Sequence, residues 1–320
     1  MFGLTFLSAT SKTTTHRVVP FSIKRLVMGV AGYAASGQDS GGNVSGIIKV
    51  AFPADTLTTL SATVSTARQY PAGFANSAVA GYAAGGYSGG EISAIDKVTF
   101  PADTLTTLSA TLTTARYGAA GFANSGVAGY VAGGIDSARI SGIDKVTFPA
   151  DTKTTLSATL TSARDLASGF ANSGVAGYVA GGFDSSYISG IDKVSLPADT
   201  KTTLSATLTT ARNGVSGFAN SGTAGYAAGG YTGSNVSGID KVTFPADTKT
   251  TLSATLTTAR QTAYGFANSG VAGYVAGGFD SSYISGIIKV AFPADTLTTL
   301  SATLTTARGN GAGFADSGTL

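Results

Sequence analysis

Few residues in this chain have side chains that could do chemistry. Among its 320 residues the sequence contains one histidine, His16, and no cysteine. A Ser-His-Asp triad or a multi-histidine metal site needs histidine beside its other members, and a thiolate site needs cysteine. The single histidine lies close to the N-terminus, away from the repeated part of the chain. We therefore expect no catalytic activity, no bound metal and no cofactor.

Two charged residues recur at one fixed interval. The phrase "PADT" begins at Pro53 and returns every 48 residues as far as Pro293, and "TAR" ends at Arg68 and returns at the same spacing as far as Arg308. Six equivalent arginines could form a positive ring. The alternative that we favour is that each guanidinium binds backbone carbonyls or a nearby aspartate between two repeats. The aspartates recur in the same way, which indicates structural roles.

These residues are positioned by six tandem copies of one unit, which fill the chain from about residue 29 to its end. Self-similarity at such a period is typical of solenoids, arrays and propellers. In the fourth copy, period-2 patterns and turn residues predict four short antiparallel strands. The predicted strands are 167–171, 175–181, 188–196 and 202–208, with turns at 172–174 and 197–200. In the last strand, Leu204 and Leu208 face away from Thr203 and Thr207, as in an edge strand.

Four-stranded sheets this rich in glycine and alanine cannot bury both faces alone, so the copies must stack. Radial stacking predicts an all-β fold, a six-bladed β-propeller with four antiparallel strands per blade. The chain ends on "GAGFADSGTL", which matches the start of a copy, whereas the repeats begin at a second strand. We therefore expect residues 313–320 to supply the inner strand of blade 1 and close the ring. Residues 4–17 resemble residues 57–68, so the N-terminal segment is an alternative occupant of blade 1, or packs on its outside.

The charge of the chain is low and unevenly placed. Charged residues make up 12% of the sequence, and the net charge is +3. The basic residues of the N-terminal stretch, which has no acidic residue, are Lys12, Arg17, Lys24 and Arg25. We divide the chain into a basic arm, 1–28, that docks on a protein partner, and a propeller, 29–320. The arm has no nucleic-acid-binding motif, and neither a signal peptide nor a membrane span is expected.

The six copies differ from one another mainly in two stretches. One follows each "TAR" arginine, as in "QYPA" (69–72), and the other follows each Gly-Gly pair, as in "FDSSY" (183–187). Because the strands alternate in direction, both stretches must emerge on the same face. Tyrosine amid Ser, Gly, Asp and Asn is typical of recognition surfaces, although loops can also drift without binding anything. The candidate binding residues are Tyr70, Tyr87, Tyr117, Arg139, Asp165, Tyr187, Tyr231, Tyr264 and Tyr283.

Two copies are nearly the same. Blades 4 and 6 share 23 identical residues, 169–191 and 265–287. The copies form a mosaic, as if they had recently been duplicated or recombined. Such a sequence suits a rapidly changing recognition protein.

The unit resembles the Kelch-type propeller repeat. It has an arginine before the first strand and a Gly-Gly pair after the second, as at Gly181-Gly182 and Gly277-Gly278. Runs such as "GYVAGGFDSSYISGIDKV" are similar to the Kelch-like repeats of virion and tail proteins of tailed bacteriophages, notably those that infect cyanobacteria. The chain departs from the Kelch pattern in having no tryptophan, and blade 1 has Ser36-Gly37 instead of Gly-Gly.

This resemblance implies a non-enzymatic virion protein, part of a tail fibre or another exposed appendage. Its arm would bind other virion proteins, and several copies would face a host surface glycan or protein. One alternative is a secreted or surface lectin-like propeller of a bacterium. The other is a purely structural cement or collar protein without a ligand.

Overall fold

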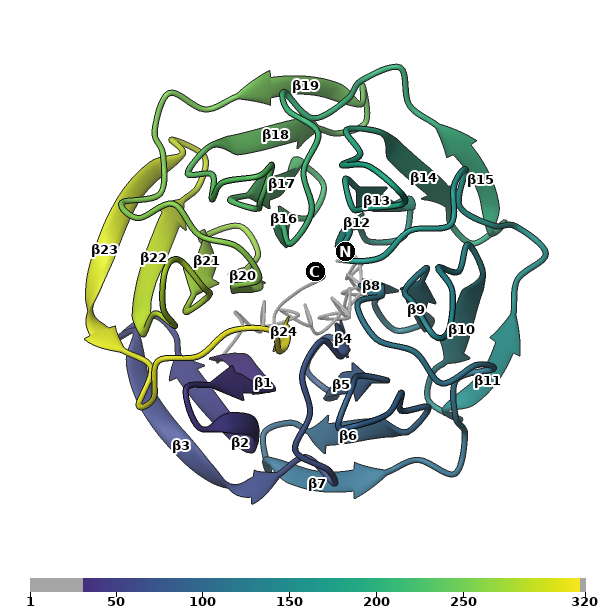
Figure 1. Cartoon of the computed structure of the whole chain (residues 1–320), viewed down its shortest axis with the longest axis horizontal. Coiled ribbons are helices and arrows are strands. Elements are labelled where there is room, and N and C mark those ends of the chain that lie inside the picture. Colours follow the sequence, from purple (N-terminus) through teal and green to yellow (C-terminus); the bar gives the residue numbers. More distant parts are fainter. Residues whose placement is uncertain (1–30, 317–320) are drawn as a thin grey trace, which may run out of the picture.

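The computed structural model describes residues 31–316, which form six four-stranded antiparallel sheets arranged in a ring (Figure 1). The predicted all-β fold, a six-bladed β-propeller, is confirmed. The predicted arm, 1–28, lies outside the described residues, and with it Lys12, Arg17, Lys24 and Arg25. Residues 31–316 contain no helix that is long and apolar enough to cross a membrane.

Each blade contributes one inner, two middle and one outer strand. Blade 1 consists of β24 (Ala312–Ala315), β1 (Ala31–Asp39), β2 (Gly42–Ala51) and β3 (Thr56–Thr63). Blade 2 consists of β4 (Ala72–Asn76), β5 (Ala80–Ala84), β6 (Ile95–Thr99) and β7 (Thr104–Thr107). Blade 3 consists of β8 (Ala120–Asn124), β9 (Ala128–Ala132), β10 (Ile143–Thr147) and β11 (Thr152–Thr155). Blade 4 consists of β12 (Ser168–Asn172), β13 (Ala176–Ala180), β14 (Ile191–Ser195) and β15 (Thr200–Thr203). Blade 5 consists of β16 (Ser216–Asn220), β17 (Ala224–Ala228), β18 (Ile239–Thr243) and β19 (Thr248–Thr251). Blade 6 consists of β20 (Tyr264–Asn268), β21 (Ala272–Ala276), β22 (Gly286–Ala291) and β23 (Thr296–Thr303).

The hydrophobic core lies between successive blades. In blade 2, Phe74 of the inner strand stacks on Tyr82 of the next strand, with ring centroids 4.9 Å apart. Tyr82 also stacks on Phe148 of blade 3, at 5.2 Å. All three side chains are buried, and equivalent stacks recur around the ring. The blades are therefore held face to face by aromatic surface that no single sheet could cover.

The inner strands approach one another closely around the axis. A Cβ atom at Gly121 of β8 would lie 2.1 Å from the carbonyl oxygen of Gly73 in β4. Backbone atoms cannot yield that space to a side chain, so glycine is required at this position. Gly313 of β24 meets the same condition, since its Cβ would lie 2.2 Å from the carbonyl oxygen of Gly265.

A C-terminal strand closes the ring, as predicted; of the predicted segment 313–320, residues 317–320 lie outside the described residues. β24 pairs with β1 in antiparallel register, from Gly32 opposite Ala315 to Ala35 opposite Ala312. Figure 1 shows this yellow strand beside the purple first strand. Blade 1 thus joins the two ends of the described chain in one sheet, and the alternative in which the N-terminal segment fills this place is wrong.

The outer strands are shorter than expected. The predicted strand 202–208 ends at Thr203 in the structure, although its alternation persists, with Leu208 buried and Thr207 exposed. Only β3 and β23 run for 8 residues. In the blades with short outer strands, Asp192 and its equivalents accept hydrogen bonds from a threonine of the outer strand and from a threonine or serine of the preceding connection. Ile48 and Ile288 stand at that position in blades 1 and 6, and there the outer strand continues past a bulge.

Candidate binding face

The loops that vary among the copies lie together on one face of the ring. The connections after each "TAR" arginine pair with the loops after each Gly-Gly pair, as Gln69 pairs with Tyr87 and Asp165 with Phe183. The "ANSG" and "PADT" turns meet on the opposite face, where the Phe100 N–H donates to the Val79 carbonyl at 2.8 Å. The predicted division of the loops is confirmed. We call the first the variable face and the second the uniform face.

Each aspartate of a "PADT" turn fastens one blade to the preceding blade. Asp199 of blade 4 accepts a hydrogen bond from the Tyr130 hydroxyl at 2.8 Å and from Lys145 Nζ at 2.6 Å, both in blade 3. The same contact occurs at all six junctions between blades. At the junction where the ring closes, Tyr274 and Lys289 of blade 6 donate to Asp55 of blade 1. These aspartates are therefore structural, as predicted.

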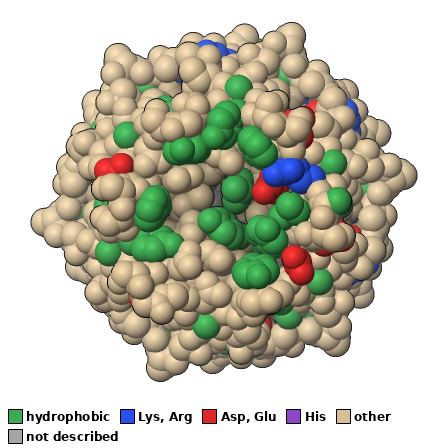
Figure 2. Space-filling view, viewed as in Figure 1, with side chains coloured by type: hydrophobic (Ala, Val, Ile, Leu, Met, Phe, Trp, Pro, Cys, Tyr) green, Lys and Arg blue, Asp and Glu red, His purple; other side chains and the backbone are tan. Residues whose placement is uncertain are grey.

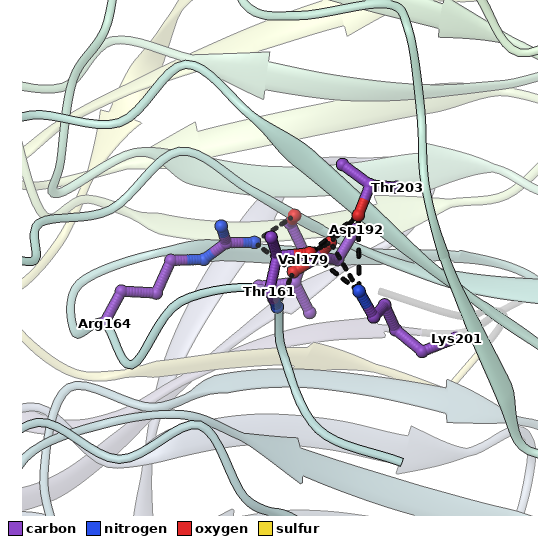
Figure 3. A network of polar contacts seen from close by, with 6 residues as sticks. All are labelled: Thr161, Arg164, Val179, Asp192, Lys201 and Thr203. Carbon is purple, nitrogen blue, oxygen red and sulfur yellow. Dashed lines mark hydrogen bonds and ion pairs between the residues drawn. The ribbon is translucent and has the colours of Figure 1, made fainter.

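The "TAR" arginines are buried between blades rather than gathered as an open positive ring. Arg164 donates from Nη2 to the Val179 carbonyl at 3.0 Å and to Asp192 at 3.1 Å (Figure 3). Burial favours the neutral acid of Asp192, but hydrogen bonds from Thr161 and the charge of Arg164 outweigh it and lower its pKa. Arg260 has Ile288 in place of the aspartate and donates to three backbone carbonyls, two of them at 3.0 Å and that of Thr258 at 3.2 Å. The preferred prediction for these arginines is confirmed.

A closed ring of backbone hydrogen bonds surrounds the axis on the variable face. The Gly118 N–H donates to the Tyr70 carbonyl at 2.9 Å, and the Tyr70 N–H donates to the backbone carbonyl of Asn310 at 2.5 Å. The six residues in this ring, all with left-handed φ between 50° and 65°, are Tyr70, Gly118, Leu166, Gly214, Thr262 and Asn310. They border an axial depression with a cavity volume of about 90 Å³. The backbone is the same in every blade, while the side chain at the mouth differs.

Half-buried aromatic side chains gather around this depression. Tyr117 lies 5.3 Å from Tyr87 and 6.0 Å from Tyr70, measured between ring centroids. Tyr187 makes similar contacts with Phe183 of its own loop and with Tyr231 of the next blade. Figure 2 shows the hydrophobic side chains as a broken ring around the central hollow. Six of the seven predicted tyrosines thus lie on the variable face: Tyr70, Tyr87, Tyr117, Tyr187, Tyr231 and Tyr283.

The predicted residues Arg139 and Asp165 form one ion pair across two blades. Arg139 Nε donates to Asp165 Oδ1 at 2.8 Å, and the guanidinium lies 4.7 Å from the centre of the Phe183 ring. Asp165 is only 7% exposed, so its carboxylate is held beneath the arginine. The guanidinium, partly exposed, is the part of this pair that a ligand can reach.

Tyr264 does not belong to the accessible surface, and its predicted role as a binding residue is wrong. Its exposed fraction is 0%, and its hydroxyl donates to the Ser36 carbonyl at 2.6 Å. Burial raises the pKa of this phenol. Tyr264 begins the inner strand β20, at the position of Ala72 and Ser216 in other copies. Alignment to those small inner-strand residues is the signal that would have identified it as a core position.

Residues that sequence reasoning overlooked lie where blade 6 meets blade 1. The hydroxyl of Tyr283 donates to Gln38 Oε1 at 2.5 Å, and Asn310 Nδ2 donates to the same oxygen at 3.2 Å. Gln38 lies near the tip of a longer hairpin than those of other blades, because blade 1 has one extra residue there. Because of this extra residue, a comparison at strict intervals of 48 residues does not align Gln38 with its equivalents in other blades.

The fold and the site define a six-bladed β-propeller with one chemically varied face. No group of three or more His, Cys, Asp or Glu residues that could hold a metal ion occurs within residues 31–316. No protein-family model matches the sequence, and no match is found among curated proteins. The class of the protein therefore follows from its architecture and from the chemistry of its surface.

Proposed function

We propose that this protein is a non-enzymatic recognition protein whose variable face binds a host surface glycan or protein. The observation that carries the proposal is the gathering of half-buried aromatic rings, amides and hydroxyls on the variable face, around the axial depression. Rigid aromatic side chains supply contact area at low cost in conformational entropy, and interface energy concentrates in such residues.

The uniformity of the opposite face has a cause of its own. The "PADT" aspartates join neighbouring blades, so their invariance among the copies follows from packing. The difference in variability between the two faces is therefore weak support for binding. The kinds of side chain on the variable face are stronger support. A surface that had only drifted would have no reason to collect aromatic residues beside hydrogen-bonding groups.

We further propose that the protein is a component of a phage tail fibre or another exposed appendage of a virion. The support is the resemblance of its repeats to Kelch-like repeats of phage virion proteins. The Asp316 N–H donates to the Ala31 carbonyl at 3.0 Å, and the Ala78 N–H to the Asp316 carbonyl at 2.7 Å, so the ends of the described chain lie on the uniform face. A virion partner bound through residues 1–28 would leave the variable face free.

The test compares two surface variants of the intact chain. The binding variant replaces Tyr187 and Tyr283 with Ala. The control replaces Val127 and Val175 with Ser; these side chains, 44% and 48% exposed, lie in turns of the uniform face. Binding of labelled protein to a panel of bacterial cells, cyanobacteria included, is measured by flow cytometry, with folding checked by circular dichroism.

Loss of binding only in the tyrosine variant supports recognition by the variable face. Equal binding by both folded variants overturns it, whereas a folded unaltered protein that binds none of the cells leaves the cement or collar alternative. Mass spectrometry of purified phage particles separates a virion protein from a secreted or surface lectin-like propeller, because only the former would be found in the particle.

A further inference from the structure

A second cavity opens beside the axial depression, between blades 6, 1 and 2. Its volume is about 220 Å³, which is smaller than the ~300 Å³ at which pockets for drug-sized ligands begin. Its main lining side chains are Gln38, Tyr70, Gln261, Phe279, Tyr283 and Asn310. It shares Tyr70, Thr262 and Asn310 with the axial depression, so the two spaces are neighbours. A cavity of this size suits one ring-sized unit of a larger ligand.

The amide groups of this cavity are held in place with hydrogen-bonding capacity to spare. Gln38 Oε1 accepts hydrogen bonds from Tyr283 and Asn310, and Asn310 Nδ2 also lies 3.3 Å from the Tyr283 hydroxyl. Among residues 31–316, Gln38 Nε2 and Asn310 Oδ1 make no hydrogen bond. Asn310 is only 7% exposed, so its side chain is fixed by its surroundings. One free donor and one free acceptor are thus presented close together.

The remaining walls are aromatic and uncharged. Phe279 and Tyr283 meet edge to face with ring centroids 5.2 Å apart, and Tyr70 also lines the cavity. No lining side chain is ionised at neutral pH, because the lining consists of amides, hydroxyls and aromatic rings. An ionic ligand would find no counter-charge here, whereas a neutral polyol would find both ring faces and hydrogen-bonding partners.

Blade 4 provides a natural comparison within the same chain. It has the identical loop "FDSSY", with Phe183 and Tyr187 in the same edge-to-face contact. Its neighbour is the Tyr231 ring, and Gly214 stands at the position equivalent to Asn310. The amides of blade 1 and of the C-terminal segment therefore distinguish this cavity from the surroundings of the same loop in blade 4.

We propose that the cavity formed by Gln38, Gln261, Tyr283 and Asn310 binds one neutral pyranose unit of a glycan. The inference rests on the proposed recognition function and names its ligand class. Gln38 Nε2 donates to one sugar hydroxyl and Asn310 Oδ1 accepts from its neighbour, while Tyr70 and Phe279 cover the apolar edges of the ring.

The test uses Asn310→Gly and Gln38→Ala, with Val175→Ser on the uniform face as the control. Glycine already occupies the position of Asn310 in two other blades, as Gly118 and Gly214, so its left-handed backbone is retained. Methyl glycosides of glucose, galactose and mannose, with glucuronic acid as the anionic probe, are titrated by calorimetry and by ligand-observed NMR. We expect at least one neutral glycoside to bind, and each cavity variant to weaken it about tenfold, as for the loss of a hydrogen bond. Val175→Ser should leave the affinity unchanged.

Preference for glucuronic acid, or unchanged affinity in Asn310→Gly, overturns the proposal. So does cell binding that protease treatment of the cells abolishes, because the ligand is then a protein. If no glycoside binds but the Tyr187 and Tyr283 variant still loses cell binding, the sugar cavity fails while recognition by the variable face stands. If that variant keeps cell binding, the proposed function itself fails.

Discussion

The ring of Tyr264 occupies the space that a side chain at position 311 would need: a Cβ atom at Gly311 would lie 2.2 Å from Tyr264 Cε1. The tyrosine belongs to blade 6 and the glycine to the segment that leads into β24. Through its hydroxyl, Tyr264 also holds the Ser36 carbonyl of blade 1. We call the junction between blades 6 and 1, where the chain closes on itself, the seam. It is filled by one aromatic side chain, whereas the other junctions between blades have a small residue at this position.

Replacing Tyr264 should open this seam. Tyr264→Ser introduces the residue that blades 4 and 5 have at the equivalent position, but it leaves a cavity beside Gly311, and we expect a loss of about 3 kcal/mol in the free energy of unfolding. Urea unfolding followed by fluorescence measures it. The control Tyr231→Ser, at a half-buried tyrosine of the variable face, should cost less than half as much. Equal losses would show that the seam has no special part in stability.

The contacts of the "PADT" aspartates predict a second effect on stability. Asp199→Ala leaves the buried Tyr130 hydroxyl and the Lys145 ammonium without their partner, at a cost of about 1–3 kcal/mol. Asp55→Ala should cost as much, since it removes the same contact between blades 6 and 1. Thermal unfolding detects the change, and Thr202→Ala on the exposed outer strand serves as the control. A melting temperature unchanged in the aspartate variants would contradict the structural role given to these turns.

Stability should decrease in acid because of the aspartates that pair with the "TAR" arginines. In Asp144, Asp192 and Asp240 the pKa is lowered by hydrogen bonds and the arginine charge, against the opposing effect of burial. A lowered folded pKa means that the contribution is complete above the unfolded value of about 3.9, and is lost as pH falls through the lower folded value. Urea unfolding at pH 7, 5 and 3 should show the drop between pH 5 and 3. Asp192→Asn should reduce that drop while lowering stability at pH 7; an identical pH profile would refute the assignment.

Removal of the closing strand should weaken the whole ring. A chain ending at Gly311 lacks β24, which leaves the edge of β1 unpaired and uncovers Tyr33, whose ring stacks on Phe314 at 5.4 Å. We expect its melting temperature to fall by more than about 10 °C, as for a loss of several kcal/mol. A chain ending at Asp316 retains every described contact and should unfold like the full chain. Similar melting of the two truncated chains would mean that closure contributes little.

Local patterns were enough to predict much of this fold. Gly-rich turns, period-2 alternation and the 48-residue repeat specify strands and the order in which they pair, because these depend on residues close together in sequence. The closing strand was predictable for a similar reason: "GAGFA" at 311–315 has a glycine at the position where the inner strands of neighbouring blades nearly touch. The length of the outer strands was not predictable from local patterns. It varies with whether an aspartate or an isoleucine faces the neighbouring connection.

The sequence by itself determined the blades, their number and the face on which variation collects, because a repeat imposes the same local structure on every copy. Only the tertiary structure decided which side chains meet. Tyr130 and Asp199 are 69 residues apart, and Gln38 and Asn310 are 272 residues apart, yet each pair is in hydrogen-bonding contact. Such contacts depend on how one blade faces the next and on where the chain closes. That is why Tyr264 is buried at the seam while Tyr283, from the same blade, lines a cavity with the two amides.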